Sequence, residues 1–159
     1  MTNQAIDGDD DSDGAPGDRI WASQWYRITP RSFVHVELFF DPERIIYAFA
    51  GESYKSILLR QDGREQRAEE LGAQYRDRSA TELLADDRHE ATQLPDIDAI
   101  ELSSGSLLRK PELTIQTVDN DRDRTFYHFS RRHDPTSLGE QLVEHYPSVT
   151  VTIDGEKME

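Results

Sequence analysis

Apolar and polar side chains alternate from residue 31 onward, which is the pattern of a β-strand with one buried face. One face carries Val34, Val36, Leu38 and Phe40, and the other carries Phe33, His35, Glu37 and Phe39. Turn-forming residues follow at 41–44, and a second apolar run over residues 45–50 ends at Gly51. We therefore predict a half-buried strand that pairs with a second strand in a β-hairpin.

The segment after this hairpin, about residues 55–86, is highly charged and changes to helical spacing. Its apolar residues, three and four positions apart, are Ala68, Leu71 and Tyr75. This spacing predicts an amphipathic helix over residues 64–77. Ser79 and Glu82 have the spacing of a capping box, so a short second helix should begin there. The two helices form an insertion between strands.

The β pattern returns in three segments, residues 97–103, 112–118 and 124–130. The last two are separated by a turn-rich aspartate sequence, so the three segments predict an antiparallel meander. An amphipathic helix should follow, since Leu138, Leu142 and Tyr146 recur every fourth residue after Asp134-Pro135.

The two ends of the chain differ from this pattern. Residues 1–18 contain six Asp and few apolar side chains, which predicts a disordered acidic tail. We expect residues 19–153 to form a single domain, in which residues 148–153 could add an edge strand. Residues 154–159 should be a loose tail.

This order of elements is similar to that of pleckstrin-homology-like (PH-like) domains of bacteria and archaea. The segments that carry the resemblance are residues 33–50, 94–102, 110–115, 126–129 and 135–146. The resemblance covers about residues 31–146 and implies an α+β fold, in which a strongly bent antiparallel sheet or partial barrel is capped by the C-terminal helix. It also implies binding of lipids, peptides or other proteins. The charged insertion departs from the family pattern and leaves the strand count before Leu94 open. An ordinary α+β sheet covered by helices is the alternative.

The charge composition of the chain indicates the salt environment to which the protein is adapted. The chain has a formal net charge of −14, and only three of its 18 cationic residues are Lys. An acidic, lysine-poor surface stays hydrated in concentrated salt, and the composition resembles that of halophilic archaeal proteins. An acidic mesophilic protein with a disordered tail is the alternative. Either way, general nucleic-acid binding is disfavoured, because phosphate contacts need a cationic surface.

The chain contains no cysteine, and we find no membrane-spanning run or signal peptide in it. We therefore expect a cytoplasmic protein without disulfides or thiolate chemistry.

Two segments are candidates for partner binding. The first is basic: Arg109 with Lys110, Arg122 with Arg124, and Arg131 with Arg132 flank the last two strands of the meander. A hairpin could gather them near one end of the sheet, where guanidinium groups would suit an acidic peptide or an anionic lipid headgroup. Salt bridges to the interleaved Asp119, Asp121, Asp123 and Asp134 are the competing interpretation.

The second candidate is aromatic. Trp21, Trp25 and Ile28 would share one face of a helix just after the acidic tail, and Trp is enriched where partners dock. The competing interpretation is that this stripe packs on its own domain and covers a barrel mouth.

The sequence contains no catalytic or cofactor motif. Asp9, Asp11, Asp13 and Gly14 have the spacing of the first half of an EF-hand loop, but Ile20 occupies the position of the bidentate glutamate, so we expect no metal site there. The sequence therefore favours a non-enzymatic partner-binding or scaffold module, with a protein or acidic peptide as the expected partner. One alternative is a small metal-dependent hydrolase that uses His35 and His128, if their strands are neighbours. Another is a structural subunit that self-associates through an exposed Trp face.

Overall fold

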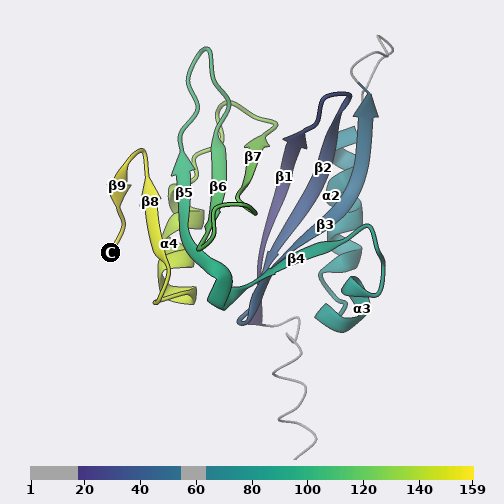
Figure 1. Cartoon of the computed structure of the whole chain (residues 1–159). Helices are drawn as coiled ribbons and strands as arrows, with labels where there is room; N and C mark the ends of the chain where they lie inside the picture. Colours follow the sequence, from purple (N-terminus) through teal and green to yellow (C-terminus); the bar gives the residue numbers. More distant parts are fainter. Residues whose placement is uncertain (1–17, 55–63) are drawn as a thin grey trace, which may run out of the picture.

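The protein has an α+β fold with one mixed nine-stranded sheet and three helices in the residues described by a computed structural model, 18–54 and 64–159 (Figure 1). The strands are β1 (Ile20–Ile28), β2 (Ser32–Phe40), β3 (Arg44–Tyr54), β4 (Glu90–Gln93), β5 (Ile97–Ser103), β6 (Glu112–Thr117), β7 (Arg124–His128), β8 (Thr150–Ile153) and β9 (Glu156–Lys157). The helices are α2 (Arg64–Tyr75), α3 (Ala80–Leu84) and α4 (Thr136–His145), with a 3₁₀ turn η2 at Leu94–Asp96.

The spatial order of the strands is β4-β3-β2-β1-β7-β6-β5-β8-β9. All neighbours are antiparallel except β5 and β8, which are parallel. The predicted hairpin is therefore β2–β3, and the predicted meander is β5–β6–β7. The predicted tail at residues 1–18 lies outside the described residues, except for Asp18, and so does part of the insertion, residues 55–63.

The larger core lies on the inner face of the sheet, which curves around it. Tyr47 of β3 stacks on Phe126 of β7 with ring centroids 5.4 Å apart, although two strands separate β3 from β7 in the sheet. Val36, Leu38 and Phe40 face this core, as their alternation predicts. Burial of these side chains is the main contribution that holds the two halves of the sheet together.

Helix α4 packs its apolar stripe into the same core. Leu142 and Tyr146 are fully buried, and Leu138 is nearly so. The Tyr146 hydroxyl donates a hydrogen bond of 2.5 Å to the carbonyl oxygen of Asp41, in the turn between β2 and β3. The helix therefore connects the C-terminal half of the chain to the first hairpin.

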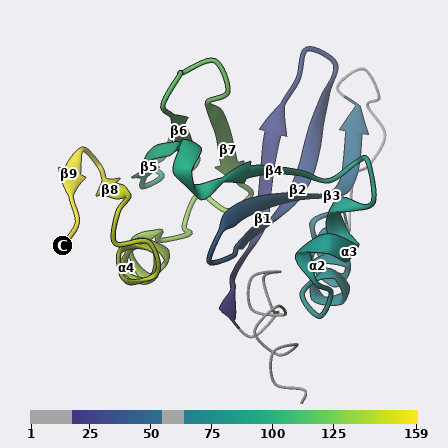
Figure 2. The same ribbon diagram turned by 60° about the horizontal axis from the view of Figure 1, so that its bottom comes forward.

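A second, smaller core lies on the outer face of β1–β3, under α2 and α3 (Figure 2). Phe39, Ile46 and Ala48 point outward from the sheet and meet Tyr75, Ala80 and Leu83 of the helical segment. Helix α3 begins with the predicted capping box between Ser79 and Glu82. Because these helices cover β2, the prediction that this strand is buried on one face only is wrong.

The segment that contains both tryptophans is a strand and not a helix. β1 pairs with β2, and one extra residue in β1 between Ala22 and Trp25 shifts the register. Gln24 in this β-bulge has a positive φ of 73°. The predicted helical face of Trp21, Trp25 and Ile28 therefore does not exist.

The chain end also differs from the prediction. Residues 154–159 were expected to be a loose tail, but Glu156–Lys157 form β9 and pair with β8. Asp154 and Gly155 have φ values of 51° and 86°, which suit the tight turn of this hairpin. Met158 then packs against the larger core.

Candidate functional site

The bulge in β1 places the two tryptophans on opposite faces of the sheet. Trp25 is 1% exposed in the larger core, and its indole ring contacts His128 and His133 edge to face. Trp21 lies on the outer face, where it stacks on Phe39 beside the helices. Both tryptophans therefore pack on their own domain, so a docking face or self-association face made of exposed Trp is not what the fold provides.

The outer face of the sheet also carries a cluster of rings, which we call the aromatic face, in which Tyr26 and His35 are buried and Phe33, Tyr127 and Phe129 are half-buried. It consists of Tyr26, Phe33, His35, Tyr127 and Phe129, from β1, β2, β7 and the residue after β7. The Tyr26 ring is central, with centroids 4.9 Å from Phe129, 5.6 Å from Phe33 and 5.8 Å from Tyr127. Ile28, which pairs with Phe33 at the edge of this face, is 48% exposed.

Lys110 lies on the aromatic face. Its ammonium group is 5.3 Å from the centroid of Tyr26 and 5.8 Å from that of Phe129, within the range of cation–π attraction. The half-buried lysine thereby covers part of the surface of these two rings.

Further cations come together at this end of β6 and β7. A Cβ atom on Gly105 would lie 2.5 Å from the carbonyl oxygen of Arg131 and 3.1 Å from that of Arg109. Only glycine therefore allows the β5–β6 loop to approach the residues after β7 so closely. We call Arg109, Lys110, Arg131 and Arg132 the basic cluster.

Arg122 and Arg124 do not join the basic cluster. Arg122 lies in the β6–β7 turn and Arg124 begins β7, so both are at the opposite end of this hairpin from Arg131. The expectation that one end of the sheet gathers all six cations is therefore wrong. The antiparallel hairpin explains the separation, because its turn and its open end cannot coincide.

The interleaved aspartates do not neutralise these cations in the described part of the chain. Asp119 and Asp123 accept hydrogen bonds from Thr117, and Asp134 accepts from Thr136. Arg124 pairs instead with Glu90, at 2.5 Å. Within residues 18–54 and 64–159, the guanidinium groups of Arg109, Arg131 and Arg132 have no carboxylate partner.

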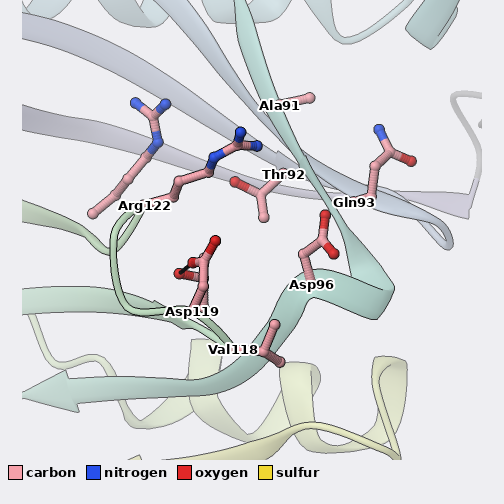
Figure 3. A pocket seen from close by; sticks show the side chains of 9 residues that line it. Ala91, Thr92, Gln93, Asp96, Val118, Asp119 and Arg122 are labelled. Carbon is pink, nitrogen blue, oxygen red and sulfur yellow. Dashed lines mark hydrogen bonds between the residues drawn. The ribbon is translucent and has the colours of Figure 1, made fainter.

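A polar cavity of about 410 Å³ lies beside Arg122 and Arg124, between β4, η2 and the β6–β7 turn (Figure 3). We call it the turn cavity. It is lined by Ala91, Thr92, Gln93, Asp96, Thr117, Val118, Asp119, Arg122 and Arg124. Its volume is within the range of small-molecule sites.

The two histidines of the hydrolase alternative lie on opposite faces of the sheet. His35 pairs with Tyr26 and faces outward, whereas His128 pairs with Trp25 and faces the core. His35 hydrogen-bonds to Ser53 and stacks on Phe129, and His128 stacks on His133. The two imidazoles cannot share a metal ion. Among the described residues, no group of three or more His, Asp and Glu side chains is arranged to hold one.

Glu37 is a buried carboxyl group that the sequence does not single out. It lies on β2 beneath Gly72 of α2, and it accepts hydrogen bonds from the Trp21 indole at 2.7 Å and the Gln24 backbone N–H at 3.1 Å. Burial raises the pKa of Glu37 to about 7, against the effect of these hydrogen bonds. The bulge in β1 therefore serves to bring a backbone donor to this carboxyl group.

In the described part of the chain, these features are two surfaces and a cavity that can bind a partner or a small ligand. Comparison of the sequence with models of known protein families finds no match, and comparison with curated proteins finds none either. No helix in the described ranges is both long and apolar enough to cross a bilayer.

Proposed function

We propose that this protein is a non-enzymatic partner-binding module that recognises an acidic peptide segment of another protein. The observation that carries the proposal is the position of Lys110 on the aromatic face, at the same end of β6 and β7 as three arginines that lack a carboxylate partner among the described residues. Apolar side chains of the partner would lie on the half-buried rings of the aromatic face, Phe33, Tyr127 and Phe129, and its carboxylates would bind the basic cluster.

A PH-like architecture is part of this proposal. Its support is the strand order β4-β3-β2-β1-β7-β6-β5, the curvature of the sheet around one core, and the helix that follows β7 and packs into that core. The helical segment between β3 and β4 and the β8–β9 hairpin are then additions to that plan. Such a fold permits binding of several classes of partner, so the aromatic face and the basic cluster, not the fold, determine which class binds.

An acidic peptide fits this surface better than an anionic membrane does. The net charge of −14 would be repelled by an extended anionic surface, because most of the protein would approach it. A short peptide needs to contact only the basic cluster. At high salt the repulsion over longer distances is screened, whereas contacts between groups that exclude water persist.

The experiment is selection from a display library of random peptides against the full chain, in KCl at which the protein is folded. We expect selected peptides to combine Asp or Glu with aromatic or aliphatic residues. Lys110→Glu should weaken their binding by tenfold or more. Lys157→Glu is the matched control, since it makes the same charge change on exposed β9. Peptides that bind both variants equally, or a selection without enrichment, would refute the proposal.

We also propose that the protein is adapted to concentrated salt in the cytoplasm. The support is the composition, with 32 acidic residues, 18 cationic residues and no cysteine. The midpoint of thermal unfolding, followed by circular dichroism, should then rise as KCl is increased to molar concentrations, because salt screens the repulsion between carboxylates. A midpoint that is constant or falls would contradict this adaptation.

A further inference from the structure

The turn cavity is separate from the surface of the proposed function. It lies at the β6–β7 turn, whereas the basic cluster lies at the opposite end of the same two strands. Both cationic and anionic side chains line the cavity, and they come from η2, the β6–β7 turn and β7. Ligand binding in the turn cavity can therefore be tested separately from peptide binding at the basic cluster.

Two guanidinium groups line the cavity, one held in place by its contacts and one without an ion-pair partner among the described residues. Arg124 lies 4.8 Å above the Tyr47 ring and pairs with Glu90, so its position is set by a buried ring and a carboxylate. The solvent-shielded Nε of Arg124 has no acceptor within the described ranges. Arg122 is exposed, and its side chain makes no ion pair with any residue that the structure describes.

The anionic side contains two carboxylates. Asp119 is held by Thr117, whose hydroxyl donates to one of its oxygens at 3.0 Å. The side chain of Asp96 is exposed and makes no hydrogen bond to the described part of the chain, while its backbone carbonyl accepts from Val118 and fixes the residue in place. Figure 3 shows the side chains of Asp96, Asp119 and Arg122 around the space beside Thr92, and Arg124 also lines this cavity.

We propose that the turn cavity binds a small zwitterion that carries a carboxylate and an ammonium group. A simple anion would gain contact with Arg122 and Arg124 but would be repelled by Asp96 and Asp119. A simple cation would meet the reverse arrangement. A ligand with both charges satisfies both sides at once, and the separation between its charges decides the fit.

The test is a titration of the ¹⁵N-labelled full chain with five probes, followed by NMR. Three zwitterions with increasing charge separation are glycine, 4-aminobutyrate and 6-aminohexanoate, and the single-charge controls are acetate and methylammonium. We expect saturable shifts at residues that line the cavity, with a Kd below about 10 mM for at least one zwitterion. That zwitterion should bind at least tenfold more tightly than either control.

Arg122→Gln and Asp96→Asn should each raise the Kd of the most tightly bound zwitterion by tenfold or more. Both side chains are exposed, so neither substitution should change the fold, and the spectrum of the free variant verifies this. Arg131→Gln, which removes a guanidinium group from the basic cluster, is the control that should leave zwitterion binding unchanged.

Three results would overturn the proposal. The first is acetate or methylammonium binding as tightly as the best zwitterion, which would make the cavity a site for a simple ion. The second is the absence of saturable shifts for all three zwitterions. The third is equal binding of the best zwitterion by Arg122→Gln, Asp96→Asn and Arg131→Gln. None of these results would affect the peptide-binding proposal, which is tested at Lys110.

Discussion

The imidazole rings of His128 and His133 lie face to face, with centroids 3.8 Å apart and planes 7° apart. Trp25 packs edge-on against both rings. His128 Nδ1 accepts a hydrogen bond of 3.0 Å from the Ser130 backbone N–H, which requires that this nitrogen is unprotonated. Burial, and then the neighbouring His133, lower the pKa of His128 to about 4. The pair is therefore stable in its neutral form.

The first prediction is a loss of stability in acid from His128. Its pKa is lower in the folded protein, about 4, than the ordinary value of 6.5 that applies to the unfolded chain. The unfolded state therefore binds a proton first, and stability present above pH 6.5 decreases as the pH falls toward 4, by about 3 kcal/mol. Urea unfolding at constant KCl measures it. His128→Phe should remove this part of the decrease.

His133 and His89 also have lowered pKa values, mainly because of burial, so His128→Phe should reduce the acid-induced loss without abolishing it. Equal pH dependence in the wild type and in His128→Phe would show that His128 is protonated in the folded protein without cost.

The second prediction is that Glu37 makes the protein less stable as the pH rises, which is opposite to the effect of His128. The pKa of this carboxyl group is about 7 in the folded protein, above its ordinary value of 4.5. The contribution of Glu37 to the free energy of unfolding is therefore fully present below pH 4.5. About 3 kcal/mol of it is lost as the pH rises to about 7. Glu37→Gln, which resembles the protonated form, should lack this loss.

The wild-type stability curve combines both effects in overlapping pH ranges, so only the difference curves separate them. Between pH 4.5 and 7, Glu37→Gln should gain stability relative to wild type as the pH rises. His128→Phe should change in the other direction. A flat difference curve for Glu37→Gln would mean that the folded protein keeps Glu37 ionised at no cost.

The elements that the sequence predicts well have a regular period. Strands β5 and β6 and helix α4 lie within a few residues of their predicted bounds, because alternation or fourfold spacing persists through each one. Strand β1 was missed for a physical reason. Its bulge inserts one residue between Ala22 and Trp25, and this disrupts the alternation and leaves a spacing that also suits a helix.

The candidate sites depended on contacts that a single sequence does not specify. Tyr26, Phe33 and Phe129 form one face only because β1 pairs with both β2 and β7. The sequence does not indicate the polar residues of the turn cavity either, because Asp96 and Arg122 line one cavity only through the approach of η2 to the β6–β7 turn. The sequence predicts that a hairpin could gather Arg122 and Arg131 near one end of the sheet, but the observed hairpin places them at its opposite ends.

The third prediction tests the close approach of α2 to the sheet. A Cβ atom on Gly72 would lie 2.3 Å from Oε1 of Glu37, which is far inside contact distance. Gly72→Ala should therefore destabilise the protein by about 1–3 kcal/mol, although alanine favours a helix. Gln74→Ala, on the exposed side of the same helix, should be nearly neutral.

A double variant identifies the cause. In the Glu37→Ala background the clashing carboxyl group is absent, so adding Gly72→Ala should cost little or should stabilise the helix. Urea unfolding of the four proteins measures the coupling. If Gly72→Ala costs the same in both backgrounds, the close approach is not to Glu37.

The fourth prediction concerns the ion pair between Arg19 and Asp41, which joins the start of β1 to the β2–β3 turn. Arg19 Nε lies 2.8 Å from Asp41 Oδ1, and the two side chains are 2% and 0% exposed. Burial raises the pKa of Asp41 and outweighs the opposing attraction of Arg19, so the carboxylate depends on its cation. Arg19→Met should then destabilise the protein by about 3–5 kcal/mol at neutral pH, because it leaves a buried charge unpaired.

The double variant Arg19→Met, Asp41→Asn should recover much of this loss, since it removes both charges. If urea unfolding instead gives additive losses for the two substitutions, the pair is not coupled, and other contacts of the β2–β3 turn, such as its hydrogen bonds to His145 and Tyr146, hold it in place.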